Sequence, residues 1–108
     1  MKGNIYFSGL RQDRKMIWEC PNSALPAVIS RFRFSGGRLL SLIGIPDYDG
    51  EVKLEYCFDV NGHVCIVTVK SQLNTVYSSA SVFAHISFFE KEISRVLSVT
   101  FIPTENIS

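Results

Sequence analysis

The sequence predicts an α+β fold in which two helices pack on a small mixed or antiparallel sheet. Two apolar segments rich in β-branched residues flank Asn61-Gly62, a pair that favours the two-residue turn of a β-hairpin. Two further segments, 22–37 and 87–97, repeat apolar residues with the period of an amphipathic helix. At 108 residues the chain has the length of one domain, which we place at 1–108.

The first predicted strand is 14–20, where Met16 and Trp18 fall on one side before a proline breaks the segment. A second strand is expected at 38–46. Its residues form a dense apolar run, so we expect it to be buried on both faces of the sheet. Residues 47–50, which include Asp47, Asp49 and Gly50, then form a turn that leads into the hairpin.

The first predicted helix lies within 22–37. Asn22 or Ser23 is expected to cap its N-terminus, because a short polar side chain accepts a hydrogen bond from a free N–H of the first turn. Gly36 and Gly37 supply the left-handed stop at its end. The apolar stripe of this helix comprises Leu25, Val28, Ile29 and Phe32.

The register of the hairpin follows from its turn. If Asn61 and Gly62 form the loop, opposed apolar side chains share one face of the sheet and polar ones the other. Cys57 and Cys65 then lie on opposite faces, so these two cannot form a disulfide. The pairs expected on the apolar face are Phe58 with Cys65, Tyr56 with Val67 and Leu54 with Val69, and those on the other face are Lys53 with Lys70, Glu55 with Thr68 and Asp59 with Val64.

The C-terminal third is predicted to hold one more helix. Residues 71–81 have the composition of a polar loop, and 81–86 form either a final strand or an extended approach to the helix. Ser87 and Glu90 match a capping box, with Ser87 at the N-cap and Glu90 at the third helical position. The chain then leaves as a short strand or a tail. The helix is expected to bury Phe89, Ile93, Val96 and Leu97, to carry Glu90 and Glu92 in its first turn, and to carry Arg95 in its last.

Composition excludes several classes of protein. The apolar fraction of 46% and charged fraction of 19% suit a folded globular chain. The net charge of +1 supplies no broad field for nucleic acid. No apolar run is long enough to cross a bilayer, and the N-terminus lacks the apolar core of a secretion signal, so we expect a cytoplasmic chain. Its three cysteines lack zinc-like spacing and are expected to be reduced thiols.

No constellation of residues indicates catalysis or metal binding. His63 beside the turn and His85 before the last helix have no carboxylate, cysteine or second histidine at ligand spacing. Glu90 and Glu92 stand two residues apart, which separates their directions on a helix by about 200°. They do not converge on one substrate, and either a solvated helix face or a specific contact explains them.

The segment from Phe89 to Phe101 resembles the signature of the thirty-kilodalton subunit of respiratory complex I, the NADH dehydrogenase, and of its accessory-subunit relatives in energy-converting, membrane-bound nickel-iron hydrogenases. That signature reads aromatic, Glu, Arg, Glu, two variable positions, Asp, Leu, Phe, Gly, Ile, any residue, Phe. Phe89, Glu90 and Glu92 match it, and Lys91 replaces Arg with the same charge. The apolar pattern is kept by Val96, Leu97, Val99 and Phe101.

The chain also departs from that signature. Arg95 stands where the family has Asp, which reverses a charge, and Ser98 stands where it has Gly. The His-Pro segment that follows the last Phe in the family is missing. The order of the upstream segments agrees, so the resemblance covers about 14–101, with 102–108 as a tail.

The resemblance implies a subunit without chemistry of its own. Such subunits carry no cofactor and pack against a large catalytic subunit and a small iron–sulfur subunit at the cytoplasmic face of a membrane arm. The chain's compact length is more similar to the hydrogenase branch. The resemblance then implies a complex that moves electrons from reduced ferredoxin to protons and couples this to ion translocation, with nickel-iron and iron–sulfur groups held by the partner subunits.

We therefore expect a docking surface around the last helix, and no catalytic, cofactor or metal residues in this chain. Aromatic residues such as Tyr77 exceed what one small core needs and suit interface anchors. A stand-alone domain that binds a ligand or a peptide at a sheet edge is the alternative. A small enzyme using Glu90 or His85 is a third possibility. The expected interface residues are Phe88, Phe89, Glu90, Lys91, Glu92, Arg95 and Phe101.

Overall fold

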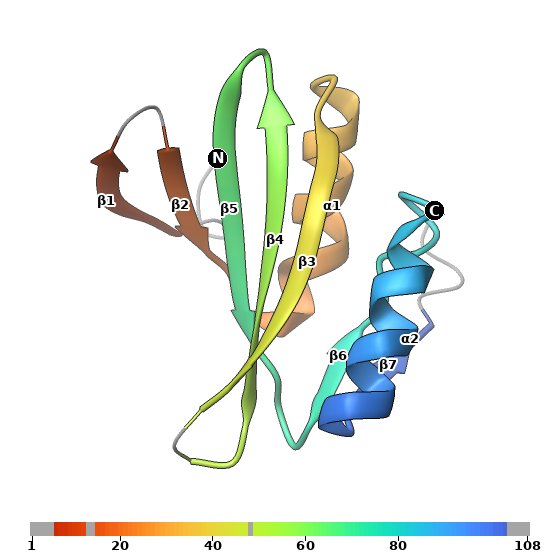
Figure 1. Cartoon of the computed structure of the whole chain (residues 1–108). Coiled ribbons are helices and arrows are strands. Elements are labelled where there is room, and N and C mark those ends of the chain that lie inside the picture. The colour runs from red at the N-terminus through yellow and green to blue at the C-terminus, as the bar shows by residue number, and fades with distance from the viewer. Residues whose placement is uncertain (1–5, 13–14, 48, 104–108) are drawn as a thin grey trace.

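The computed structural model describes residues 6–12, 15–47 and 49–103. It contains a five-stranded sheet of order β1-β2-β5-β4-β3 and a separate pair β6-β7, together with two helices (Figure 1). The α+β prediction is thereby confirmed. The strands are β1 (Tyr6–Gln12), β2 (Lys15–Glu19), β3 (Arg38–Pro46), β4 (Val52–Val60), β5 (His63–Lys70), β6 (Thr75–Tyr77) and β7 (Thr100–Ile102), and the helices are α1 (Leu25–Phe34) and α2 (Ile86–Leu97).

The hairpin of β4 and β5 has the predicted register. Asn61 and Gly62 both adopt positive φ angles, of 54° and 84°, as a tight hairpin turn requires. The Gly62 N–H also donates to the Asp59 carboxylate at 3.0 Å, which closes the turn. Cys57 and Cys65 lie on opposite faces and form no disulfide with each other. The observed pairs are Leu54 with Val69, Tyr56 with Val67, Phe58 with Cys65, Glu55 with Thr68, Lys53 with Lys70 and Asp59 with Val64.

The five-stranded sheet is mixed. β2 runs parallel to β5, whereas the pairs β1–β2, β4–β5 and β3–β4 are antiparallel. β1 adds an N-terminal strand that the sequence pattern did not predict. The predicted strand 14–20 is confirmed as β2, although Arg14 lies outside the described residues.

The expectation that 38–46 is buried on both faces is wrong. β3 is the last strand of the sheet, and only one of its faces is covered. Leu39 and Leu42 are buried on the covered face, whereas Leu40 and Ile43 are exposed. The apolar run at 38–46 therefore belongs to an edge strand that has one buried and one exposed face. Both helices lie on the covered face, which the hairpin lines with Leu54, Tyr56 and Phe58.

Helix α1 packs as predicted but begins differently. Leu25, Val28 and Ile29 are buried, and the Phe32 ring stacks on Phe58 with centroids 4.6 Å apart. Gly36 ends the helix with a φ of 81°. The prediction that Asn22 or Ser23 caps the helix is wrong, because a 3-10 turn (Asn22–Ala24) precedes it and no side chain caps it.

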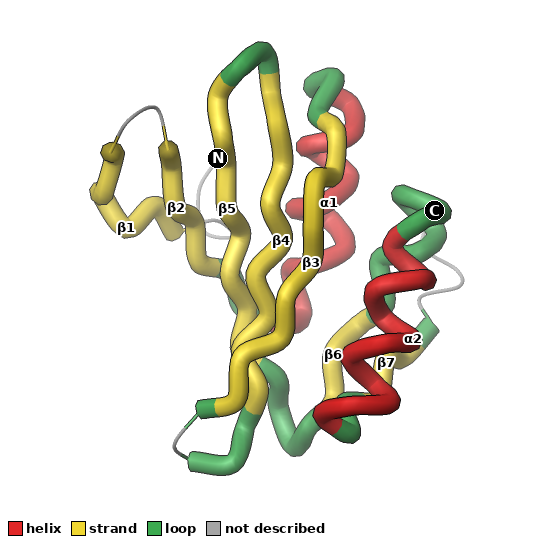
Figure 2. Tube along the Cα trace, in the orientation of Figure 1, coloured by secondary structure: helices red, strands yellow, loops and turns green. Residues whose placement is uncertain are grey.

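The prediction that 71–81 is a polar loop is also wrong. β6 lies within this segment and pairs in parallel with β7, on the far side of α2 in the sequence (Figure 2). The residues 81–85 form successive turns and Ile86 already begins α2, so neither a strand nor an extended approach precedes the helix. One contact ties these turns to α1: the Arg33 guanidinium donates to the Val82 carbonyl at 3.1 Å.

Candidate interaction surface

The predicted capping box at the start of α2 is not formed. The helix begins at Ile86 and no side chain caps it. The Ser87 hydroxyl donates to the Ala84 carbonyl at 3.1 Å instead of accepting from a free helical N–H. Because the helix starts one residue before the predicted N-cap, Glu90 lies beyond the first turn, and the structure gives it another role.

Glu90 is a buried carboxylate that joins two segments. The residue is only 6% exposed, and its carboxylate accepts hydrogen bonds from the Ser78 hydroxyl at 2.8 Å and the Ser79 N–H at 3.0 Å. Burial raises the pKa of Glu90, and these two bonds act in the opposite direction. The carboxylate therefore fixes α2 to the chain that follows β6.

Two hydroxyl groups lie beside this carboxylate in the core. Tyr56 and Ser79 are fully buried, and neither hydroxyl makes a hydrogen bond of regular geometry with the described residues. Burial, and then the nearby charge of Glu90, raise the pKa of Tyr56 far above its ordinary value, while the Ser79 hydroxyl partly opposes this. A tyrosine held neutral in the core has a structural role.

The charged residues of α2 that face solvent are Lys91, Glu92 and Arg95. Glu92 and Arg95 form an exposed ion pair one helical turn apart. Glu90 and Glu92 point in different directions, one into the core and one into solvent, as their spacing predicts. The two carboxylates therefore do not form an acid–base pair on this helix.

Two apolar side chains project from α2. Phe88 is 74% exposed and Val96 is 61% exposed, so the prediction that Val96 is buried is wrong. Phe89 and Leu97 are half-buried against the core, and Phe101 of β7 is half-buried as well. The seven predicted interface residues therefore divide into six with some exposure and one, Glu90, that is buried.

A groove of about 470 Å³ separates α2 from β7. It is open to solvent along the helix, and five of its seven lining residues come from α2. The other two come from β7. The lining residues are Ser87, Glu90, Lys91, Ser94, Arg95, Thr100 and Phe101. Four of the seven predicted interface residues meet in this groove.

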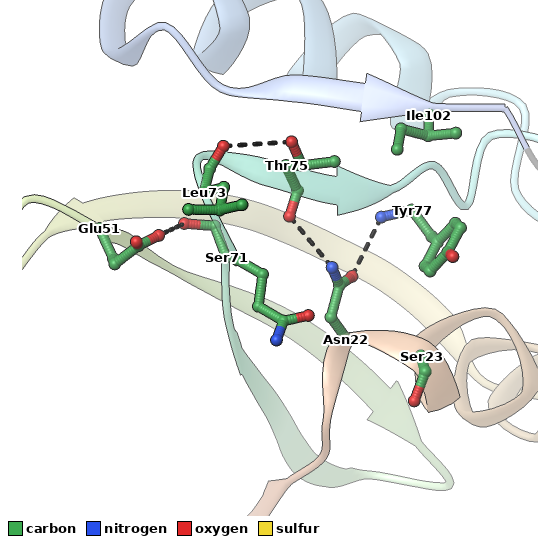
Figure 3. Close-up of a pocket in the computed structure, with 9 residues that line it drawn as sticks. Asn22, Ser23, Glu51, Ser71, Leu73, Thr75, Tyr77 and Ile102 are labelled. Carbon is green, nitrogen blue, oxygen red and sulfur yellow. Dashed lines mark hydrogen bonds between the residues drawn. The ribbon is translucent and has the colours of Figure 1, made fainter.

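A second pocket, of about 600 Å³, lies between β6 and the start of α1 (Figure 3). Asn22 forms part of its wall: its amide nitrogen donates to the Thr75 carbonyl at 3.0 Å and its oxygen accepts from the Tyr77 N–H at 3.1 Å. The Asn22 amide thus makes the hydrogen bonds to the backbone of β6 that a neighbouring strand would otherwise make. The other lining residues are Ser23, Glu51, Ser71, Gln72, Leu73 and Ile102.

The described residues contain no group of histidine, cysteine and acidic side chains that could hold a metal ion. Cys20 is buried, which raises the pKa of its thiol to about 11 and leaves it protonated and unreactive at neutral pH. His85 lies with its ring edge-on to Phe83, 6.1 Å away. In the described ranges, neither helix has the length and apolar composition needed to cross a membrane.

Sequence reasoning missed the two contacts that hold this half of the molecule together. Asn22 has the residue type and place of a helix cap, and its real partners lie 53 and 55 residues further along the chain. Glu90 fits a capping box equally well. The serines at 78 and 79 could have suggested hydrogen-bond donors for the Glu90 carboxylate. Local sequence, however, does not reveal that α2 contacts this segment.

Two solved structures share this fold. One is a chain of the membrane-bound sulfane sulfur reductase, an archaeal respiratory membrane complex, with a TM-score of 0.77 and 14% identity, covering 90% of this chain and 61% of that chain. The other is a trypsin-resistant fragment of Nqo5, with a TM-score of 0.74 and 13% identity, covering 90% of this chain and 85% of the fragment. The present chain thus spans less than two thirds of the reductase chain.

No family model and no curated protein matches the sequence. At 13% and 14% identity, the two structural likenesses establish the fold. They extend over nine tenths of this chain, so the shared fold includes most of the elements described above.

Proposed function

We propose that the chain is a non-catalytic accessory subunit of a membrane-bound respiratory complex of the complex I type. The observation that carries this proposal is the fold, which is similar both to a chain of a respiratory membrane complex and to Nqo5, a complex I subunit. A fold hosts many functions, so the choice among them depends on the surface that the fold presents.

In this proposal the chain docks on the large catalytic subunit and the small iron–sulfur subunit through α2 and β7. Phe88 and Val96 support this choice of surface, because two large apolar side chains so exposed on one helix cost free energy in water until a partner covers them. Lys91, Glu92 and Arg95 surround them with charge, which suits the polar rim of an interface.

The complex would carry the chemistry. We propose that electrons pass from reduced ferredoxin to protons through iron–sulfur and nickel-iron groups of the partner subunits, coupled to ion translocation, with an NADH dehydrogenase as the related alternative. The present chain would hold no cofactor. It would lie peripherally, on the cytoplasmic side of the membrane, and be retained there by its partners.

Affinity purification of the tagged full-length chain from the cell that makes it tests the proposal. We expect the redox subunits to co-purify with the wild type and with Phe34→Ala, a control at a residue 87% exposed on α1. Phe88→Ala combined with Val96→Ala should reduce their recovery several-fold. A stable monomer that recovers no redox subunit would contradict the proposal.

The pocket of Figure 3 favours a second candidate, a stand-alone domain that binds a ligand or a peptide. Its volume of about 600 Å³ is within the range of small-molecule sites, and Leu73 and Ile102 give it an exposed apolar side. A rise in the melting temperature of the isolated chain with a library compound, abolished by Gln72→Ala with Leu73→Ala, would favour this candidate.

A further inference from the structure

No described strand pairs with the outer edge of β7. The Thr100 N–H donates to the Asn74 carbonyl at 2.9 Å, and the Ile102 carbonyl accepts from the Ser78 N–H at 2.8 Å, so both residues direct these groups toward β6. Backbone groups alternate in direction along a strand, and Phe101 therefore directs its N–H and carbonyl away from β6. Within the described residues, the sheet that contains β7 has only two strands.

The groove beside α2 is lined on its other side by Thr100 and Phe101 of β7. Ser87, Lys91, Ser94 and Arg95 recur at intervals of three or four residues, so they form one stripe of the helix facing β7. The groove measures about 470 Å³ and is open along its length. An extended chain next to β7 would fill this groove and could bond the Phe101 N–H and carbonyl, which pair with no described strand.

The accessible charge in the groove is positive. Lys91 makes no ion pair with any residue in the described ranges, and Arg95 pairs only with the exposed Glu92. An ion pair between exposed side chains is weak, so Arg95 stays available to another carboxylate. Glu90 also lines the groove, but its carboxylate is buried and accepts two hydrogen bonds from the chain after β6.

We propose that this groove binds an extended acidic segment of a partner subunit, which adds a strand to β7 and places its carboxylates against Lys91 and Arg95. Side chains of an added strand alternate between its two faces, so every second residue would meet α2. Acidic residues are expected at those positions. The inference rests on the proposed function in one respect, the identity of the partner as a subunit of the same complex.

The edge of β3 is a poorer site for an added strand. α2 packs over β3 at Gly44, where an added methyl group would approach Leu97 to 2.8 Å. The ladder of β3 also shifts register between Leu39 and Ser41, which interrupts the regular spacing of its backbone groups. β7 combines an open edge with a positively charged wall.

A photo-crosslinking amino acid at position 100 of the tagged full-length chain tests the proposal in the native cell. We expect a crosslink to an acidic, extended segment of one co-purified subunit, identified by mass spectrometry of the joined peptides. Lys91→Glu should lower the crosslink yield about five- to tenfold, because it opposes like charges across the groove. Arg31→Glu, the same reversal on the exposed side of α1, should leave the yield unchanged.

Hydrogen exchange separates strand addition from contact by side chains alone. The Phe101 amide should exchange slowly in the purified complex and rapidly in the isolated chain, because strand addition pairs its N–H. Equal exchange in both, a basic crosslinked segment, or no crosslink from position 100 would each overturn the inference.

The two proposals fail differently. If redox subunits co-purify but position 100 reaches none of them, the subunit role stands and the groove is wrong. If position 100 reaches an acidic strand of a protein from outside any redox complex, the groove stands and the proposed function is wrong.

Discussion

The Ser79 N–H donates to the Glu90 carboxylate at 3.0 Å, within the core and across 11 residues of sequence. With the Ser78 hydroxyl as its other donor, Glu90 is the polar contact that holds α2 against the chain following β6. A carboxylate between two donors in a buried position is stabilising only while both donors remain in place. The position of α2, and of the surface it presents, depends on this contact.

Glu90→Ala should lower the free energy of unfolding by about 2 kcal/mol, because it leaves the buried Ser79 N–H without an acceptor. Urea denaturation followed by circular dichroism measures the change. Glu92→Ala is the matched control, since it removes an exposed carboxylate paired with Arg95 on the same helix and should cost less than about 0.5 kcal/mol. Equal losses in the two variants would contradict the anchoring role of Glu90.

Glu90 should also make stability depend on pH. Burial raises its pKa above the ordinary value of 4.5, so the folded chain holds the proton more tightly than the unfolded chain. The stability that this shift contributes is present below about pH 4.5 and is lost as the pH rises through the folded-state pKa. Relative to Glu90→Gln, the wild type should therefore lose stability as the pH rises from about 4 toward neutrality.

Urea unfolding of both proteins over this range of pH measures the difference. Asp49 and Asp59, whose pKa values are lowered by Lys70 and Arg38, titrate in both proteins, so their effect cancels. If the wild type instead gained stability over Glu90→Gln as the pH rose, the hydrogen bonds to Glu90 would lower its pKa in the folded chain by more than burial raises it.

Asn22→Ala should destabilise the pairing of β6 and lower the free energy of unfolding by about 2 kcal/mol. The substitution removes the acceptor of the Tyr77 N–H and the donor to the Thr75 carbonyl, at about 1 kcal/mol for each bond. Ser23→Ala, at the exposed neighbouring position, controls for the effect of a helix cap. If the Ser23 variant lost as much stability as the Asn22 variant, local capping would be the better explanation.

Gly44→Ala should push α2 away from β3. The added methyl group would lie 2.8 Å from Leu97 Cδ1 and 3.2 Å from Ile93 Cγ2, so one of these side chains has to move. We expect a cost of about 1–2 kcal/mol in thermal or urea unfolding. Leu97→Ala in the same chain should recover part of this cost, so that the double variant is more stable than the sum of the single effects predicts. Strictly additive effects would disprove the close contact.

Leu73→Asn should stabilise the isolated chain by about 0.5–1 kcal/mol. Leu73 is 88% exposed and has a φ of 52°, a backbone conformation that costs a leucine more than an asparagine. Leu73→Ala is the control, because it removes the exposed side chain but keeps the unfavourable backbone. Urea unfolding should show a higher free energy of unfolding for Leu73→Asn and not for Leu73→Ala. A similar increase for Leu73→Ala would mean that removal of the exposed leucine side chain, and not the backbone conformation, causes the stabilisation.

The sequence was sufficient for the β4–β5 hairpin and for α1 because their signals are local. Asn61-Gly62 determines the turn, and the turn determines every pair from Lys53–Lys70 to Val60–His63. The stripe of α1 follows in the same way from the helical period. The edge position of β3 was missed because an apolar run looks the same in a central strand and in a half-open edge strand.

The strand β6 and its pairing could not be predicted from local patterns. β6 has three residues and pairs with a strand that follows α2, so neither length nor alternation marks it. Asn22 and Glu90 satisfy the residue preferences of helix starts, and their partners come from distant segments. Of the predicted surface, the exposure of Phe88 and Lys91 agrees with the structure, while the burial of Glu90 depends on tertiary contacts that short-range rules do not contain.

The parallel pairing of β6 with β7 also has a kinetic consequence. Thr75 and Thr100 are paired neighbours, and the chain between them contains the whole of α2, so pairing of the two strands closes a loop that includes that helix. We infer that residues 72–103 open and close as one cooperative unit. A partner strand on β7 would then slow the opening of the entire unit, and reduced amide exchange would extend to Val76 and Ser79, which the partner strand itself does not contact.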